Sequence, residues 1–136
     1  MIKTLIFSAT YNERDNIKEL IEKINESNFD LDIFIIDDNS PDSTKEILED
    51  LKKDNSNLRF LIREGKLGLD TAHKHAYNYA IKNGYRKLIT MDADLSHDPK
   101  ELSKFNELLD EHEFIIGSRY MKGGDCEMPI LRLILS

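Results

Sequence analysis

Apolar runs alternate with helical repeats along this chain of 136 residues. The run 33–36 has the continuous hydrophobicity of a strand that is covered on both faces. Ahead of it, apolar residues recur every three or four positions, which is the pattern of an amphipathic helix. The pattern predicts strands at 5–7, 33–36, 58–62, 88–91 and 114–116, and helices carrying Ile17, Leu20, Ile21 and Ile24, then Ile47, Leu48 and Leu51, then Ala72, Ala76 and Ala80, then Leu102, Phe105, Leu108 and Leu109.

Boundary signals frame these helices. Asn12 is expected to cap the first helix, and Ser40 followed by Pro41 is expected to open the second. Gly84 has the place of a C′ residue after the third, and the segment 98–101 resembles a capping box that opens the fourth. The alternation predicts an α/β fold, with a mostly parallel sheet, helices on both faces and right-handed crossovers.

Composition narrows the class of protein. Hydrophobic residues make up 40% and charged residues 33%, which is typical of a soluble globular protein, and the length suits one domain at 1–136. The net charge of -7 argues against general nucleic-acid binding, because a phosphate backbone attracts a basic surface. The single cysteine, Cys126, fits a reducing compartment.

Membrane and export signals are sparse. The first residues lead straight into a strand-like run, so no secretory signal is expected. No run approaches the roughly 20 apolar residues that a bilayer span requires. The apolar tail 129–135 carries Arg132 and reads as a helix start, a core segment or a membrane-surface contact.

Polar residues cluster where the predicted strands end, and ligands of such sheets bind beyond the carboxyl ends of the strands. The first strand leads into Thr10-Tyr11-Asn12-Glu13, the second into Asp37-Asp38-Asn39-Ser40 and the fourth into Asp92-Ala93-Asp94. Acidic side chains gathered beside one crevice repel each other unless a cation or hydrogen-bond donors compensate. The sequence therefore predicts a ligand-binding site at the carboxyl ends of the strands.

The segment 92–94 has a specific chemical interpretation. In an extended chain, Asp92 and Asp94 point to the same side, about 7 Å apart by strand rise. Two carboxylates so placed converge on one hard divalent cation, whose other positions are filled by water and substrate phosphates. The competing interpretation is a turn with a helix cap, because aspartate favours both roles. His97 follows this turn and either contacts a ligand or is a solvated loop residue.

Other polar residues have competing interpretations. An acidic pair such as Asp37-Asp38 also occurs in response-regulator receivers, but there it follows the first strand, and a lysine follows the fifth. Lys66 lies in a glycine-containing segment that is not a P-loop, and is expected either at a phosphate or as an ordinary exposed lysine. His73 and His75 point about 200° apart on a helix, so they do not share a metal.

Five segments follow one another along the chain: Thr10-Tyr11-Asn12-Glu13, Ile36-Asp37-Asp38-Asn39-Ser40-Pro41-Asp42, Lys66-Leu67-Gly68-Leu69 with Thr71-Ala72, Met91-Asp92-Ala93-Asp94-Leu95-Ser96-His97, and Gly117-Ser118-Arg119-Tyr120. In this order they resemble family 2 glycosyltransferases of the GT-A fold, and within them the dolichol-phosphate mannose synthase group. The chain departs from the family at Ala9, where proline is usual, and at Asp70, where glycine or serine is commoner. The family domain continues past Ser136, so the resemblance implies a nucleotide-sugar-binding part that is C-terminally truncated, whether as a fragment, a shortened chain or a degenerate relative.

The resemblance implies a role for each matching position. The positions expected to bind the nucleotide sugar are Tyr11, Glu13, Asp38, Lys66, Asp92 and Ala93. A bound Mg²⁺ or Mn²⁺ is expected on Asp92 and Asp94, with Ser96 beside it. The residues expected to be catalytic are Asp92, Asp94, Arg119 and Arg132, the two arginines acting on the acceptor phosphate.

The activity implied is an inverting transfer of a mannose- or glucose-type sugar from a GDP- or UDP-linked donor to a polyprenyl or dolichyl phosphate, at the cytoplasmic face of a membrane. A sugar-to-sugar transferase of the same family is a competing interpretation, and it needs a carboxylate base. Asp125 and Glu127 are candidates for that base only by default. Two more interpretations stay open: a non-catalytic nucleotide-binding module, and a structural α/β domain whose acids are all caps.

Overall fold

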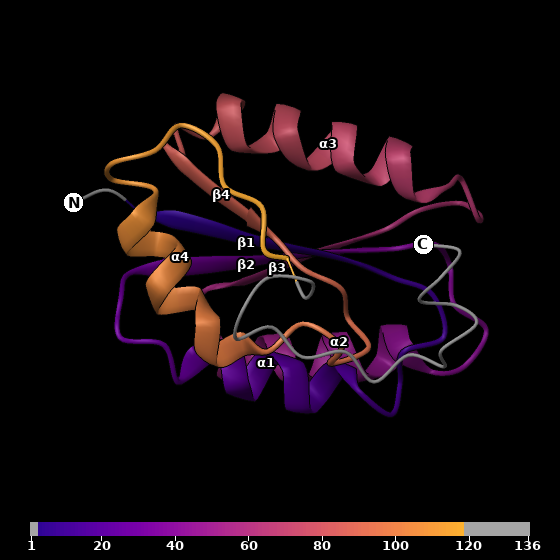
Figure 1. Cartoon of the computed structure of the whole chain (residues 1–136). Helices are drawn as coiled ribbons and strands as arrows, with labels where there is room; N and C mark the ends of the chain where they lie inside the picture. Colours follow the sequence, from indigo (N-terminus) through magenta and orange to yellow (C-terminus); the bar gives the residue numbers. More distant parts are fainter. Residues whose placement is uncertain (1–2, 119–136) are drawn as a thin grey trace, which may run out of the picture.

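The computed structural model describes residues 3–118. Strands and helices alternate along the chain (Figure 1). The elements are β1 (Thr4–Thr10), α1 (Ile17–Asn25), β2 (Leu31–Asp37), α2 (Thr44–Asp54), β3 (Leu58–Ile62), α3 (Leu69–Lys82), β4 (Lys87–Thr90), the 3₁₀ turn η1 (Pro99–Glu101) and α4 (Leu102–Leu108). The expected α/β alternation is confirmed for the strands at 5–7, 33–36, 58–62 and 88–91.

The four strands form one parallel sheet in the order β3-β2-β1-β4. Helix α3 covers one face, while α1, α2 and α4 lie on the other (Figure 1). The connections through α1 and α2 step outward from β1 to β3, and the connection through α3 returns the chain to the other side of β1. The strand order therefore reverses between β1 and β4, and such a reversal opens a crevice at the carboxyl ends of the strands.

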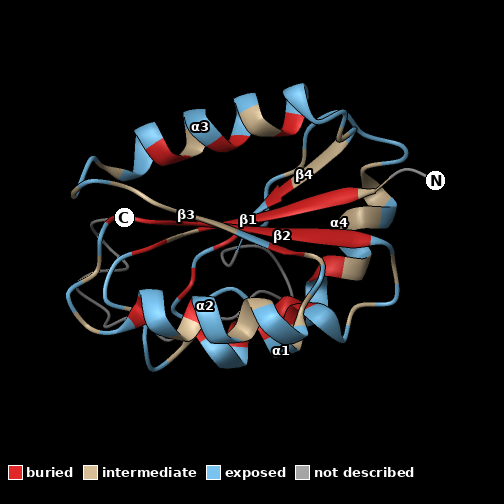
Figure 2. Ribbon diagram, turned by 180° about the vertical axis from the view of Figure 1, so that it is seen from behind, coloured by how far each residue is buried: buried red, intermediate tan, exposed pale blue. Residues whose placement is uncertain are grey.

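Strand β2 is the centre of the hydrophobic core, and all its residues are buried (Figure 2). Ile33 and Ile35 pack with α1 and α2 on one face, while Phe34 and Ile36 pack under α3 on the other. This follows from the strand period of two, which sends successive side chains to opposite faces. The prediction of a strand covered on both faces is confirmed.

The helices bury most of the stripes that the sequence indicates, but of the residues predicted for α2 and α4 only Leu48 and Leu102 are buried. The apolar stripe of α1 is fully buried, and α3 turns small side chains, Ala72, Ala76 and Ala80, toward the sheet. At the end of α3, the Gly84 N–H donates to the Ile81 carbonyl at 3.2 Å and the Tyr85 N–H donates to the Ala80 carbonyl at 3.0 Å. This paired arrangement, with Gly84 at φ 75°, is a Schellman motif, so the predicted C′ glycine is confirmed.

Two predicted helix starts are wrong. Asn12 does not cap α1, which begins at Ile17 after a turn in which the Ile17 N–H donates to the Glu13 carbonyl. Ser40 and Pro41 do not open α2, which begins at Thr44 after Ser43 in a left-handed conformation. In both loops the hydrogen bonds run between the loops instead: backbone N–H groups of the first loop donate to side chains of the second, and the Ser40 hydroxyl donates to Asp37, as described below.

The predicted strand at 114–116 is also wrong. These residues follow α4 without strand pairing, and the side chains of Phe114 and Ile116 are 80% and 73% exposed. Three apolar residues in a row favour a strand only where a neighbouring strand is available for pairing. The edge strand β4 is only four residues long, and in the part of the chain that is described it pairs with β1 alone.

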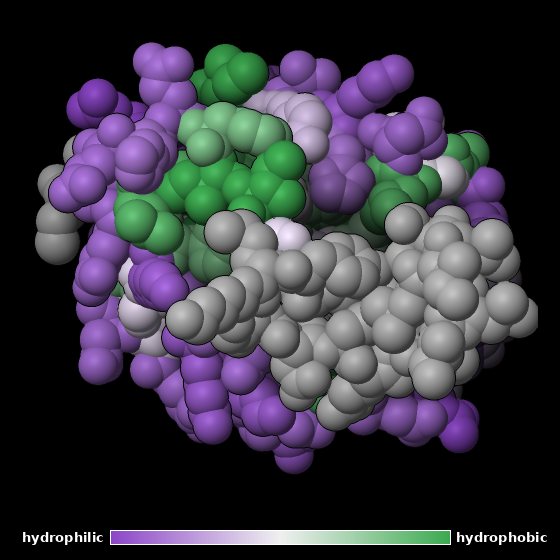
Figure 3. Space-filling view, viewed as in Figure 1, coloured by the Kyte–Doolittle hydropathy of each residue, from purple (hydrophilic) through white to green (hydrophobic). Residues whose placement is uncertain are grey.

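Part of the described surface is apolar. On the face shown in Figure 3, apolar side chains gather over β4 and the segment that follows α4, where Phe114 and Ile116 are exposed. Between residues 3 and 118, no helix combines the length and hydropathy that crossing a membrane requires.

Candidate functional site at the carboxyl edge of the sheet

Four chain segments meet where the parallel strands end. Because the strands run in the same direction, Tyr11 after β1, Asp38 after β2, Arg63 after β3 and Asp92 after β4 leave the sheet at the same edge. The loops after β1 and β4 flank the reversal of strand order. This is the expected position of the site, and the segments that the sequence indicates are brought together there.

Asp37 is structural. Its carboxylate is fully buried and accepts hydrogen bonds from the Thr10 hydroxyl at 2.8 Å and from the Ser40 hydroxyl and N–H at 2.6 and 2.8 Å. These donors compensate the buried charge. The carboxylate therefore joins the ends of β1 and β2. One of its donors is the Ser40 hydroxyl, which was expected to cap a helix.

The loop after β1 is tied to the segment that precedes α2. Three successive backbone N–H groups of the first loop donate to side chains of the second: Asn12 to Ser40 at 2.8 Å, Glu13 to Thr44 at 3.2 Å and Arg14 to Asp42 at 3.2 Å. The Glu13 carboxylate accepts from the Asn16 side chain at 2.9 Å. The sequence did not indicate this contact, although the closely spaced polar side chains of 40–44 are the residue types that bond backbone N–H groups.

Asp38 holds the loop that joins β3 to α3. One of its oxygens pairs with the Arg63 guanidinium, and the other accepts the backbone N–H groups of Leu67 and Gly68 at 3.2 and 3.3 Å. The Asp38 and Arg63 side chains are 10% and 8% exposed, so this is a buried ion pair. Arg63 is the residue that sequence reasoning missed, and its signal was a lone basic residue directly after an apolar run.

The side chains of Lys66 and Tyr11 are in contact at the surface beside this loop. The Lys66 ammonium is 4.4 Å from the centre of the Tyr11 ring, a cation–π distance. Both side chains are exposed. The structure therefore places two of the residues expected at the nucleotide side by side, although they are 55 positions apart in the sequence (66 − 11).

The segment 92–94 is a turn rather than a continuation of β4. The strand ends at Thr90, and the turn at Ala93 and Asp94 is followed by Leu95 at φ 64°. The extended geometry assumed from the sequence is therefore wrong for this pair. Asp92 and Asp94 are both exposed, while Ala93 between them is buried, so the two carboxylates stand at the surface on a turn anchored by its middle residue.

His97 contacts Asp92. The Asp92 N–H donates to His97 Nδ1 at 3.0 Å, and Nε2 of the same ring is 3.7 Å from Asp92 Oδ2. Because Nδ1 accepts this bond, the neutral ring carries its proton on Nε2, the nitrogen that faces the carboxylate. His97 therefore supports Asp92, a role that the sequence left open.

Ser96 supports Asp94 in a similar way. The Ser96 N–H donates to Asp94 Oδ1 at 3.0 Å. The hydroxyl of Ser96 is the largest influence on this carboxyl, and together with the N–H it holds the Asp94 pKa below its ordinary value, against the opposing effect of partial burial. Asp94 is therefore ionised, which a metal ligand requires.

The donor set suits a hard divalent cation that is shared with a ligand. Residues 3–118 contain no cluster of three or more His, Cys, Asp or Glu side chains placed to hold a metal. Asp92 and Asp94 are exposed carboxylates without a lysine or arginine ion pair in that range, and Mg²⁺ is usually bound through one or two carboxylates together with substrate phosphates. The residues present fit such an ion.

Left-handed backbone marks the same edge. The described residues other than glycine with positive φ are Asn12, Asn39, Ser43 and Leu95, and all of them lie in loops that follow β1, β2 or β4. Such conformations cost free energy and gather at functional sites, where surrounding contacts maintain them. Hydrogen bonds of Asp37, Ser40 and Asp42 supply such contacts in the loops after β1 and β2, and those of Asp94 and His97 supply them in the turn after β4.

Some residues that the sequence analysis considered do not lie at the carboxyl-edge site or are not described. His73 packs edge-on against Phe7 and His75 packs near Phe34, so the two histidines belong to the α3 face of the sheet. Arg119 and Arg132, expected to be catalytic, lie outside the described residues. Nothing in the described part of the chain tests their roles.

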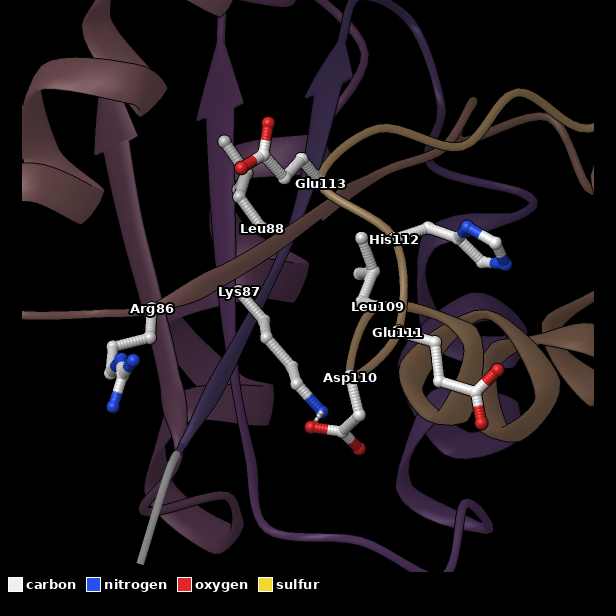
Figure 4. Close-up of a pocket in the computed structure, with 8 residues that line it drawn as sticks. All are labelled: Arg86, Lys87, Leu88, Leu109, Asp110, Glu111, His112 and Glu113. Carbon is white, nitrogen blue, oxygen red and sulfur yellow. Dashed lines mark ion pairs between the residues drawn. The ribbon is translucent and has the colours of Figure 1, made fainter.

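A separate hollow of about 490 Å³ lies at the opposite end of β4 (Figure 4). Lys87, the first residue of β4, points at Asp110 there, with 2.8 Å between Nζ and the carboxylate. Because the strand separates this hollow from Asp92, it is not part of the carboxyl-edge site.

Comparison with known proteins places the chain in a family. Residues 6–128 match the model of glycosyl transferase family 2. The chain is 35% identical to the polyprenol monophosphomannose synthase of Mycolicibacterium smegmatis, covering 98% of this chain and 52% of that protein. It is 32% identical to the dolichol-phosphate mannosyltransferase of Saccharomyces cerevisiae, covering 99% of this chain and 52% of that protein. The chain therefore spans about half the length of these relatives.

Solved structures share the fold. A mannosyltransferase from Pyrobaculum calidifontis, in complex with GDP-Man and Mn²⁺, superimposes with a TM-score of 0.59 at 21% identity, covering 67% of this chain and 27% of that one. The S. aureus TarS fragment 1–349 in complex with UDP superimposes with a TM-score of 0.62 at 24% identity, covering 82% of this chain and 33% of that one. The match over most of its length, together with these likenesses, shows that the chain belongs to glycosyl transferase family 2 and resembles its dolichol-phosphate mannose synthase group.

Proposed function

We propose that this chain is the nucleotide-sugar-binding part of an inverting glycosyltransferase, which moves a mannose- or glucose-type sugar from a GDP- or UDP-linked donor to a polyprenyl phosphate. The observation that carries the proposal is the meeting, at one sheet edge, of the Lys66–Tyr11 pair with the exposed Asp92 and Asp94 carboxylates. The relatives named for polyprenol and dolichol phosphates support the choice of acceptor.

In this proposal the site has a nucleoside end and a diphosphate end. Tyr11, Glu13 and Lys66 lie at the nucleoside end, and Asp38 belongs to the same end through the loop that it holds. Asp92, Ala93 and Asp94 lie at the diphosphate end. Asp92 and Asp94, with Ser96 beside them, would hold Mg²⁺ or Mn²⁺, and the ion would neutralise negative charge on the departing diphosphate.

The residues of this chain position the reactants. The bond from the anomeric carbon to the diphosphate oxygen breaks as a bond to an acceptor phosphate oxygen forms, and the nucleoside diphosphate leaves. A phosphate acceptor is already an anion near neutral pH, so no general base is needed.

We assign Arg119 and Arg132 to the acceptor phosphate, because arginine binds phosphate through paired donors. In a transfer assay, Arg119→Gln should raise the acceptor KM more than the donor Kd, and equal losses would contradict this assignment.

The first test is binding of the donor. Thermal-shift and calorimetric titrations of the chain with GDP-mannose and with UDP-glucose, each with and without Mn²⁺, should give one selective and metal-dependent complex. Asp92→Asn and Asp94→Asn should each weaken that complex at least about tenfold, the effect of losing one charged ligand. Binding by both variants at wild-type strength would remove the metal site from the proposal.

A matched control separates this effect from a general loss of charge. The Asp110 side chain is 60% exposed and that of Asp92 is 59%, but Asp110 lies at the amino end of β4 and pairs with Lys87. Asp110→Asn should therefore leave donor binding unchanged.

Donor binding without sugar transfer, in an assay that also supplies polyprenyl phosphate, would favour a non-catalytic nucleotide-binding module. Transfer to a sugar hydroxyl would favour the sugar-to-sugar reaction.

A further inference from the structure

Arg63 pairs with Asp38 and also donates hydrogen bonds to the loop 64–68 and to the start of α3. Its Nε and Nη2 face Asp38 Oδ1, its Nη1 donates to the Thr71 hydroxyl at 2.7 Å, and its Nη2 donates to the Gly68 carbonyl at 2.9 Å. These partners come from the end of β2, the loop 64–68 and the first turn of α3. One buried side chain therefore joins the three segments around Lys66.

Asp38 completes the frame from the other side. Its second oxygen receives the N–H groups of Leu67 and Gly68, the residues that immediately follow Lys66. The Lys66 side chain itself has its cation–π contact with Tyr11, in the loop after β1. The backbone on the C-terminal side of Lys66 is thus fixed, while the ammonium remains exposed at the nucleoside end of the site.

We propose that Arg63 is a positioning residue for nucleotide binding. It holds Asp38 and the loop 64–68 in the arrangement that places the Lys66 ammonium beside Tyr11, and it does not itself contact the nucleotide. The geometry requires arginine, because the three partners lie in different directions and a planar guanidinium reaches them with separate N–H groups, whereas a lysine ammonium is a single point. This inference rests on the proposed function.

A double-mutant cycle in nucleotide binding tests the proposal, with GDP and UDP plus Mn²⁺ as the probes. Lys66→Gln should weaken binding of the preferred nucleotide by about tenfold, the size of one charge-assisted contact. Arg63→Met should cause a similar loss. In the double variant, Lys66→Gln should add little to the loss from Arg63→Met, because the ammonium is no longer held in place.

A role in stability alone would give a different result. If Arg63 only stabilised the fold, the Lys66→Gln loss would be the same in both backgrounds, and that additivity would overturn the proposal. Wild-type nucleotide affinity in Arg63→Met, or in Lys66→Gln alone, would overturn it as well. A wild-type chain that binds neither nucleotide would instead show that the proposed function has failed.

Two further variants keep the test interpretable. Removing one member of a buried ion pair is strongly destabilising, so Arg63→Lys, which retains the charge but not the fork, replaces Arg63→Met in the cycle if the latter does not fold. Arg59→Met, on the strand β3 that Arg63 directly follows, is the matched control. The Arg59 guanidinium bonds only to the Ser56 and Leu58 carbonyls in the described structure, at the other end of β3, and its loss should leave nucleotide affinity unchanged.

Discussion

At the scale of single residues, the acids at the carboxyl edge divide into two kinds. Asp37 and Asp38 are buried, and backbone N–H groups, hydroxyls and a guanidinium satisfy their oxygens. Asp92 and Asp94 are exposed, and they bond to neighbours within their own turn. Buried acids with a full set of donors stabilise the loops, whereas exposed acids remain free to bind a cation. Burial, which one sequence does not show, makes this distinction.

Asp42 gives a prediction about acid stability. Burial raises its pKa, but bonds from the Thr44 hydroxyl and from the Arg14 and Thr44 N–H groups outweigh that effect and lower the pKa below the ordinary 3.8. A carboxyl with a lowered folded-state pKa contributes stability that is complete above its unfolded value and is lost as pH falls through the folded one.

Asp42→Asn should therefore be less stable than the wild type at neutral pH, and the difference should shrink as pH falls below about 4, close to the unfolded value. Urea unfolding at several pH values measures this. Glu46→Gln, at an exposed acid of α2, is the control against which the Asp42→Asn trend is compared. A constant Asp42 difference across the acid range would contradict the assignment.

At the scale of elements, the end of α3 follows from sequence and the starts of α1 and α2 do not. A C′ glycine acts locally, because only the last turn of the helix and a left-handed backbone are needed. The polar residues Asn12 and Ser40 have both local and distant partners to choose from, and in the folded chain they bond across to each other's loop. Capping rules compare local options only, which explains both errors.

Gly84→Ala tests the local part. The backbone at Gly84 has φ 75°, and an added Cβ would meet no atom within 4 Å, so the cost is conformational alone. We expect a loss of about 1 kcal/mol in the free energy of unfolding, measured by urea denaturation. Gly65→Ala is the matched control, because it is equally open and has no positive φ. Its stability should match or exceed that of the wild type, and equal losses at both sites would refute the conformational explanation.

At the scale of the whole molecule, one sheet carries two cores. Residues of β1 and β2 alternate between the cluster under α1, α2 and α4 and the cluster under α3. Neither face can lose its packing without disturbing strands that the other face also needs. The described part of the chain should therefore unfold cooperatively.

Truncations on opposite faces of β2 test this cooperativity. Ile35→Ala and Ile36→Ala each remove a fully buried side chain and should each lower the free energy of unfolding by about 2–5 kcal/mol. Tyrosine fluorescence, which reports mainly on the α3 side, and far-UV circular dichroism should give coincident transitions in both variants. Ile81→Ala, at a residue that is 77% exposed, is the control and should change little. Separate transitions for the two probes would show that the faces unfold independently.

The sequence alone determined what depends on periodicity and on local backbone chemistry. The four described strands, the buried stripes of the helices, the C′ glycine and the segments of the site follow from patterns that neighbouring residues set together. The strand at 114–116 could not be judged in this way, because pairing requires a partner strand that hydrophobicity does not reveal.

Only the tertiary structure decided what each polar residue of those segments does. It paired Arg63 with Asp38, set Lys66 over Tyr11, bent 92–94 into a turn and placed His97 against Asp92. The physical reason is that hydrogen bonds and ion pairs act over a few ångströms of space, and the sheet brings together residues that are tens of positions apart in the chain.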